Sequence, residues 1–103
     1  MVTVVAAFTV KPEHEEEAIG ILKGVVAASH EEEGCLLYTL NKAKNQPHTW
    51  SIVEKWRSQE DLDAHFGKPH MAPMADAAGM LAEPPTVLFC EPVPTGDAAK
   101  GSL

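Results

Sequence analysis

His48–Met74, with the sequence HTWSIVEKWRSQEDLDAHFGKPHMAPM, is the stretch that decides the fold, and it holds both tryptophans and three of the five histidines. Its first part, Trp50–Trp56, is short and rich in aromatic and β-branched residues, and therefore predicts a strand. Side chains alternate between the two faces of a strand, so Glu54 shares a face with Ile52 and with both tryptophans. A carboxylate on an apolar face is costly unless it has a partner or a raised pKa, which makes Glu54 the unusual residue of this strand.

A short helix is expected directly after this strand. Ser58 is a candidate N-cap, and Asp61 follows three residues later in an acidic variant of the capping box. Leu62, His65 and Phe66 then fall on one face of the helix. The helix would bring His65 back toward the strand, and a Gly-Lys-Pro sequence would end it.

Upstream of this stretch, the sequence predicts one strand and one long helix. Thr3–Val10 is apolar and β-branched, as buried strands are. Pro12 fits the first turn of a helix that we expect from about Glu13 to about Glu32, because apolar residues recur there at helical spacing. Gly34 is expected to end this helix in the left-handed conformation. The acidic run Glu31–Glu33 is interpreted as a solvated face.

The remaining elements complete the order βαββαβ. Cys35–Leu40 predicts a second strand, which a hairpin loop at Asn41–Pro47 joins to the Trp50–Trp56 strand. His70–Leu81 predicts a helical segment interrupted by a proline, and Thr86–Glu91 predicts the last strand. This order is typical of an α+β, ferredoxin-like fold, in which a four-stranded antiparallel sheet carries its helices on one face.

The predicted strands are apolar on both faces, although the helices can cover only one. Leu36 and Leu37 in the second strand, like Ile52 and Val53 in the third, cannot all point toward the helices. The other face needs a partner sheet, which a second copy of the same chain supplies most simply. We therefore expect a homodimer in which the two sheets pack together.

The composition argues against several classes of function. The chain has 103 residues and a formal net charge of −7, and its eight basic residues are scattered, so nucleic acid is not an expected partner. No apolar run reaches the ~20 residues of a membrane span, and the start of the chain lacks the pattern of a signal peptide. We expect a cytoplasmic protein with one domain over residues 1–93 and a flexible tail over residues 94–103.

The two cysteines point to structural thiols. Cys35 and Cys90 lie far apart in apolar strands and are expected to be buried and reduced, with a disulfide or a reactive thiol as the alternatives. The sequence has no CxxC motif and no Cys/His spacing that suggests zinc, so we assign no metal ligands.

Several motifs resemble one known family. The chain is similar to the antibiotic biosynthesis monooxygenases, and among them to the small bacterial quinol monooxygenases, in Gly34-Cys-Leu-Leu-Tyr38, Glu54-Lys-Trp56-Arg-Ser, Leu62-Asp-Ala-His65-Phe and Pro69-His70-Met. The similarity extends over about Val2–Pro92. It implies a dimeric α+β barrel with a pocket between sheet and helices in each subunit. It also implies oxidation of quinols or polycyclic phenols by O2 without a metal, flavin or haem cofactor.

Histidine suits the base that such chemistry needs. A cofactor-free oxygenase must make its substrate electron-rich, usually by removing a phenolic proton, and the unperturbed pKa of histidine is about 6.5. His65 is the first candidate for this catalytic base and His70 the second. Glu54 would orient His65 if the two pair, and Arg57 or a backbone amide are its other candidate partners. A structural role stays open for all three candidates.

Aromatic and methionine side chains from the same region would form an apolar slot for a flat ring. The expected substrate-binding residues are Tyr38, Trp50, Trp56, Phe66, Met71 and Met74. The proline-interrupted segment Gly67–Gly79 would act as a lid.

Three functions fit these features. The first is a cofactor-independent monooxygenase that oxidises a small quinol or phenolic aromatic with O2. The second is an acid–base isomerase of a small polar metabolite, and the third is a ligand-binding dimer without turnover. Only Arg57 and Lys68 are cations near the candidate site in sequence, which favours an uncharged aromatic ligand over a phosphorylated one.

Overall fold

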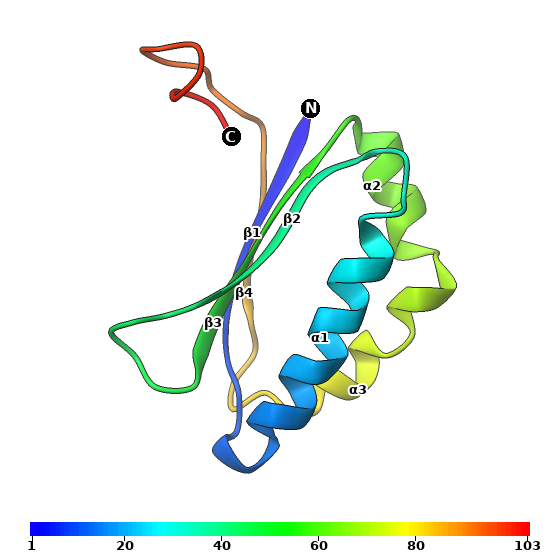
Figure 1. Cartoon of the computed structure of the whole chain (residues 1–103), viewed down its shortest axis with the longest axis vertical. Coiled ribbons are helices and arrows are strands. Elements are labelled where there is room, and N and C mark those ends of the chain that lie inside the picture. Colours follow the sequence, from blue (N-terminus) through cyan, green and yellow to red (C-terminus); the bar gives the residue numbers. More distant parts are fainter.

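Four strands form one antiparallel sheet in the computed structural model, which describes residues 1–103. The strands are β1 (Val2–Thr9), β2 (Cys35–Lys42), β3 (Thr49–Trp56) and β4 (Thr86–Cys90). Their spatial order is β2-β3-β1-β4 (Figure 1), so the first and last strands of the chain lie side by side in the sheet. This arrangement confirms the ferredoxin-like α+β fold.

The helices lie on one face of the sheet, as the sequence predicts (Figure 1). They are η1 (Pro12–His14), α1 (Glu15–Ser29), α2 (Gln59–Phe66), η2 (Pro69–Met71) and α3 (Met74–Ala78), where η1 and η2 are single 3₁₀ turns. The first helix is shorter than expected, because α1 ends at Ser29 rather than near Glu32. The acidic run Glu31–Glu33 therefore lies in the turn between α1 and β2.

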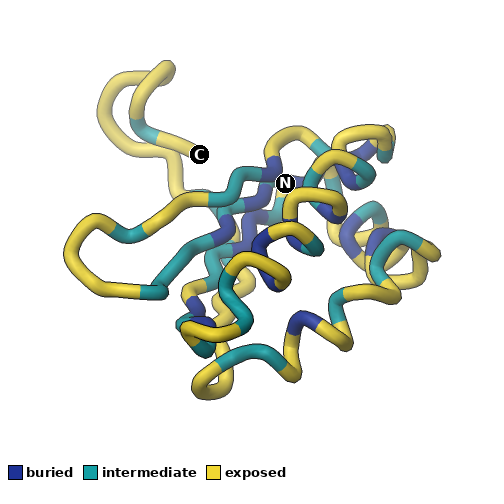
Figure 2. The backbone as a smooth tube through the Cα atoms, turned by 60° about the horizontal axis from the view of Figure 1, so that its bottom comes forward, coloured by how far each residue is buried: buried dark blue, intermediate teal, exposed yellow.

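The core lies between the sheet and the helices, where buried residues gather (Figure 2). Val4 pairs with Glu54 and Ala6 pairs with Ile52, which places these residues on the face that the helices cover. Glu54 thus points into the core and not toward the open face of the sheet. The buried apolar cluster consists of Val4, Phe8, Val10, Ala18, Ile19, Leu22, Tyr38, Ile52, Trp56 and Leu62.

The opposite face of the sheet is uncovered in the single chain. Leu37 pairs with Lys55 and Leu88 pairs with Val5, so both leucines lie on this second face. Their exposed fractions are 37% and 56%. We expect a homodimer because these large apolar side chains are exposed on an open sheet face, which a second sheet could cover. The homodimer itself stays a prediction.

The start of α2 is capped as the sequence predicts. Ser58 is extended, and its hydroxyl oxygen accepts a hydrogen bond from the Asp61 backbone N–H at 3.1 Å. The Asp61 carboxylate in turn accepts a hydrogen bond from Arg57 Nε at 2.8 Å, and the hydrogen bond from Arg57 holds the pKa of Asp61 below its ordinary value. Because α2 begins directly after β3, its inner face presents Leu62 and His65 to the sheet.

The prediction that Gly34 adopts the left-handed conformation is wrong. Positive φ angles occur only at His48 and Gly96. Gly34 is instead a point of close approach, because a Cβ atom at this position would overlap with Asp61 Cβ. The missing side chain lets the start of β2 pack against α2.

Gly34→Ala is therefore expected to lower the free energy of unfolding by about 1–3 kcal/mol, the usual cost of overpacking. Gly20→Ala is the matched control, because a Cβ on this α1 glycine meets no atom within 4 Å and alanine favours helix over glycine. Urea unfolding of both variants checks the prediction. Equal stability of Gly34→Ala and the wild type would contradict it.

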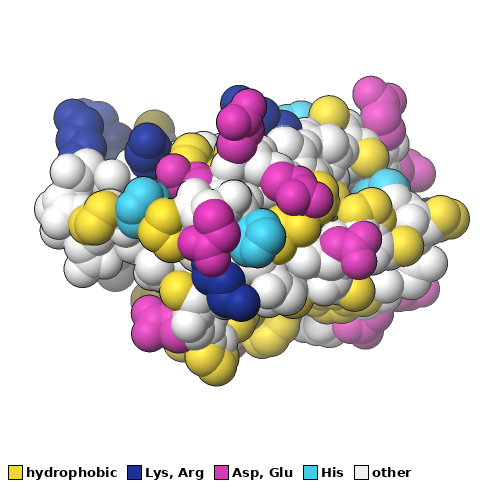
Figure 3. Space-filling model, turned by 90° about the horizontal axis from the view of Figure 1, so that it is seen from below, with side chains coloured by type: hydrophobic (Ala, Val, Ile, Leu, Met, Phe, Trp, Pro, Cys, Tyr) yellow, Lys and Arg dark blue, Asp and Glu magenta, His cyan; other side chains and the backbone are white.

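The surface carries more acidic than basic groups. Figure 3 shows Asp and Glu side chains spread among hydrophobic ones over one face, with few Lys or Arg, in line with the net charge of −7. None of the helices has the length and hydropathy needed to cross a membrane.

Beyond β4, the end of the chain folds back in a turn in which the Thr95 N–H donates to the Gly101 carbonyl at 3.1 Å. The division into a domain and a flexible tail stays a prediction.

Candidate functional site

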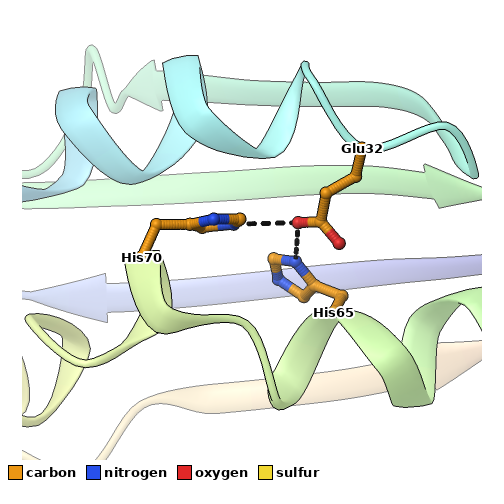
Figure 4. A group of neighbouring side chains, drawn as sticks. All are labelled: Glu32, His65 and His70. Carbon is orange, nitrogen blue, oxygen red and sulfur yellow. Dashed lines mark hydrogen bonds and ion pairs between the residues drawn. The ribbon is translucent and has the colours of Figure 1, made fainter.

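The carboxylate of Glu32 lies between two histidines. One of its oxygens, Oε2, is 2.7 Å from His65 Nδ1 and 2.9 Å from His70 Nε2 (Figure 4). The three residues come from the turn after α1, from α2 and from η2. The Glu32 side chain is only 9% exposed, so the solvated face that the sequence suggested for Glu31–Glu33 is wrong at Glu32.

His65 is buried against aromatic side chains, with 1% of its surface exposed. Its ring centroid lies 4.5 Å from that of Trp56, 5.8 Å from that of Tyr38 and 5.5 Å from that of Phe66. Leu62, one helical turn earlier, is fully buried and fixes the face of α2 that points inward. The helix therefore holds the His65 imidazole in one place.

The shared carboxylate oxygen fixes where the imidazole protons lie. A carboxylate only accepts hydrogen bonds, so His65 Nδ1 and His70 Nε2 each donate an N–H to Glu32. The other nitrogen of His65 points away from Glu32 (Figure 4). In a neutral ring this Nε2 atom carries a lone pair and can accept a proton. The resulting imidazolium would be stabilised by the Glu32 carboxylate.

His70 connects the cluster to solvent. Its side chain is 24% exposed, whereas the other two members of the cluster are almost inaccessible. Its ring centroid is 6.0 Å from that of His65. The structure thus brings the two predicted histidines together, and it does so through a carboxylate that the sequence did not assign to the site.

Glu54 has a different partner from those the sequence offered. Its Oε1 accepts a hydrogen bond from Trp56 Nε1 at 2.9 Å, inside the core. His65 bonds to Glu32, and Arg57 bonds to Asp61 at the surface, so Glu54 does not orient His65 by a hydrogen bond. Burial raises the pKa of the Glu54 carboxyl, and the hydrogen bond from Trp56 offsets part of this effect.

The raised pKa predicts that Glu54→Gln stabilises the fold at neutral pH. A protonated Glu54 contributes stability that is fully present below the ordinary value of 4.5 and is lost as the pH rises through the folded-state pKa. Glutamine keeps an oxygen that can accept from Trp56 but carries no charge. The advantage of the variant in urea unfolding should therefore grow from acidic to neutral pH. An advantage that does not change with pH would count against this account.

The predicted wall residues do not all lie at one place. Tyr38, Trp56 and Phe66 contact the His65 ring, and Met71 lies half-buried in η2 beside His70 in the chain. Trp50 is not brought to this group. It stands six residues before Trp56 on the same strand, about 20 Å away, and its indole N–H donates to Glu15 at 3.0 Å.

An apolar cavity of about 150 Å³ lies between the sheet, α1 and α3. Its walls include Phe8, Ala18, Leu22, Ile52, Met74 and Ala77. Met74 is the only predicted wall residue among them. The cavity is lined by the first half of α1, whereas Glu32 follows the last turn of that helix. The single slot expected from the sequence is thus two places: a histidine cluster with aromatic walls, and a separate apolar cavity closed on one side by the predicted lid segment.

Comparison with known proteins shows to which family this chain is related. The family model described as antibiotic biosynthesis monooxygenase matches residues 1–77, which is most of the chain. The chain belongs to this family. The resemblance read from the motifs is thereby confirmed.

Curated relatives are similar at low identity. "Putative monooxygenase YcnE" of Bacillus subtilis is 30% identical over 70 residues, which cover 68% of this chain and 74% of the relative. "Putative monooxygenase Rv0793" of Mycobacterium tuberculosis is 26% identical over 98 residues, 94% of this chain and 96% of the relative. A Synechocystis protein, sll1783, is 27% identical over 84 residues, and the match spans only 57% of its length.

Solved structures of similar proteins share the fold. The structure of Rv0793 superposes with a TM-score of 0.85 at 26% identity and covers 93% of this chain and 98% of its own. The crystal structure of PA3566 from Pseudomonas aeruginosa gives a TM-score of 0.78 at 27% identity, over 86% of this chain and 90% of its own. The fold prediction thus has independent support.

Glu32 is the functional candidate that the sequence reasoning missed. Three consecutive glutamates at the end of a helix carry no signal that singles out one of them. The helix ends three residues before Glu32, and the turn that follows aims its side chain inward. The helix was expected to continue to about Glu32, so the inward direction of the Glu32 side chain could not be predicted from the sequence.

Proposed function

We propose that this protein is a cofactor-independent monooxygenase that oxidises a small quinol or phenolic aromatic with O2. The observation that carries the proposal is the buried His65, whose Nδ1 donates to Glu32 at 2.7 Å while aromatic rings surround it. Membership of the antibiotic biosynthesis monooxygenase family supports the class of reaction. The substrate class rests on the apolar and aromatic character of the surroundings of His65 and on the scarcity of cations there.

His65 would act as the general base. Its Nε2 takes the phenolic proton, and the Glu32 carboxylate stabilises the imidazolium that forms. The phenolate left behind is electron-rich and can reduce O2. One oxygen atom enters the substrate ring, and the other leaves as water together with two hydrogens of the substrate. The substrate supplies all four electrons, so a phenol leaves as a quinone and a quinol leaves as a hydroxyquinone. His70 would hold the Glu32 carboxylate in position, because it donates a hydrogen bond to the same oxygen. The proton on His65 Nε2 would leave from that same nitrogen, with the oxygen atom that departs as water.

Oxygen uptake tests the function directly. Metal-free protein is incubated with a panel of reduced quinones and small phenols, and the consumption of O2 is compared with autoxidation without protein. We expect at least one member of the panel to be consumed faster than its autoxidation, with one O2 used per product molecule. No uptake above background across the panel would overturn the proposal and favour isomerase activity or ligand binding without turnover.

The homodimer is part of the same proposal. Leu37 and Leu88 on the open sheet face would become buried when a second sheet packs there. Sedimentation equilibrium at micromolar concentration should give twice the chain mass of 11.1 kDa. Leu88→Lys places a charge in this interface and should shift the mass toward that of one chain. A wild-type mass near 11.1 kDa would contradict the prediction.

A further inference from the structure

We propose that Glu32, His65 and His70 form a binding site for a divalent metal ion of the zinc class. One ligand atom from each residue lies within 4.8 Å of the other two, and the three residues come from three different elements of the fold. Two imidazole nitrogens and a carboxylate oxygen suit Zn²⁺, Co²⁺ or Ni²⁺, whereas Mg²⁺ and Ca²⁺ prefer oxygen ligands throughout.

The geometry is close to what such an ion needs. Ligands about 2.0–2.1 Å from a tetrahedral ion lie roughly 3.3 Å from one another. Glu32 Oε2 is now 2.7 Å from His65 Nδ1 and 2.9 Å from His70 Nε2, so the cluster must open by several tenths of an ångström. The two residues that can move are Glu32, in a turn, and His70, in the 3₁₀ turn η2. His65 is held in the core.

Burial and access favour an ion at this position. The Glu32 side chain is 9% exposed, so its negative charge is poorly screened by water and attracts a cation strongly. His70, with its side chain 24% exposed, leaves a route from solvent. Three protein ligands leave one coordination position open, as in catalytic rather than structural zinc sites.

Metal binding would change the tautomer of His65. A metal takes the lone pair of the nitrogen that it binds, so the proton now on Nδ1 would have to sit on Nε2. Nε2 would then donate a hydrogen bond instead of accepting a proton. The occupied site should therefore block the base chemistry assigned to His65. This consequence rests on the proposed function, whereas the binding of the ion does not.

Binding is tested on the full chain after removal of metal by a chelator. Zn²⁺ is titrated by calorimetry, and Co²⁺ is followed by its visible absorption, which reports coordination geometry. We expect one ion per chain. His70→Ala and Glu32→Gln should each weaken binding by at least about 10- to 100-fold. His48→Asn is the matched control, because His48 also faces a glutamate, Glu15, at 3.4 Å, and asparagine tolerates its positive φ.

Each outcome decides the question. Stoichiometric binding that both site variants weaken and His48→Asn leaves intact supports the site. No stoichiometric binding, or equal weakening by His48→Asn, overturns it. The oxygen-uptake assay uses metal-free protein, so its failure leaves the binding result standing. If both succeed, one equivalent of Zn²⁺ should suppress uptake in the wild type.

Discussion

Replacing His65 with glutamine is expected to lower oxygen uptake on the best substrate of the panel by about 10²- to 10⁴-fold, the usual contribution of a general base. Glutamine can still donate a hydrogen bond to Glu32 but has no basic nitrogen, so the variant removes the proton acceptor and keeps much of the packing. Initial rates of O2 consumption at saturating substrate measure the effect, and circular dichroism checks that the variant is folded.

Two comparisons make this result specific. His48→Asn should leave the rate unchanged, because His48 borders the β2–β3 loop and pairs with Glu15 rather than Glu32. Glu32→Gln should lower the rate less than His65→Gln, since it removes the charge that stabilises the imidazolium but leaves the base in place. A folded His65→Gln variant with the wild-type rate would rule out His65 as the base.

Trp56→Phe is expected to lower the free energy of unfolding by about 2–4 kcal/mol. Trp56 has none of its surface exposed, and its indole N–H is the hydrogen-bond donor to the buried Glu54 carboxylate. Phenylalanine leaves a cavity and leaves that carboxylate without its partner. Urea unfolding, followed by circular dichroism, measures the loss.

Trp50→Phe provides a matched control on the same strand. Trp50 also donates to a glutamate, Glu15, at 3.0 Å, but it is only half-buried and lies at the other end of β3. Its replacement should cost less than about 1 kcal/mol, because water can solvate the released carboxylate. Equal losses in the two variants would show that burial of the Glu54 pair has no part in the stability.

The sequence of this protein determined its fold through strong local patterns. The alternation in Trp50–Trp56, the cap at Ser58 and the order of strands and helices were sufficient for the ferredoxin-like arrangement. The same patterns placed His65 on the inner face of α2. These features could be predicted because each depends on neighbours within a few residues along the chain.

Only the tertiary structure decided the partners of the buried polar groups. Glu54 faces the helices and bonds to Trp56, although a strand apolar on both faces leaves its register undetermined. Glu32 reaches His65 and His70, which stand 33 and 38 residues later in the chain. Such contacts depend on where α1 ends and how its last turn meets α2, because a shift of one residue along a helix rotates a side chain by about 100°. The histidines of the candidate site could therefore be predicted from the sequence, whereas the carboxylate that joins them could be identified only in the folded chain.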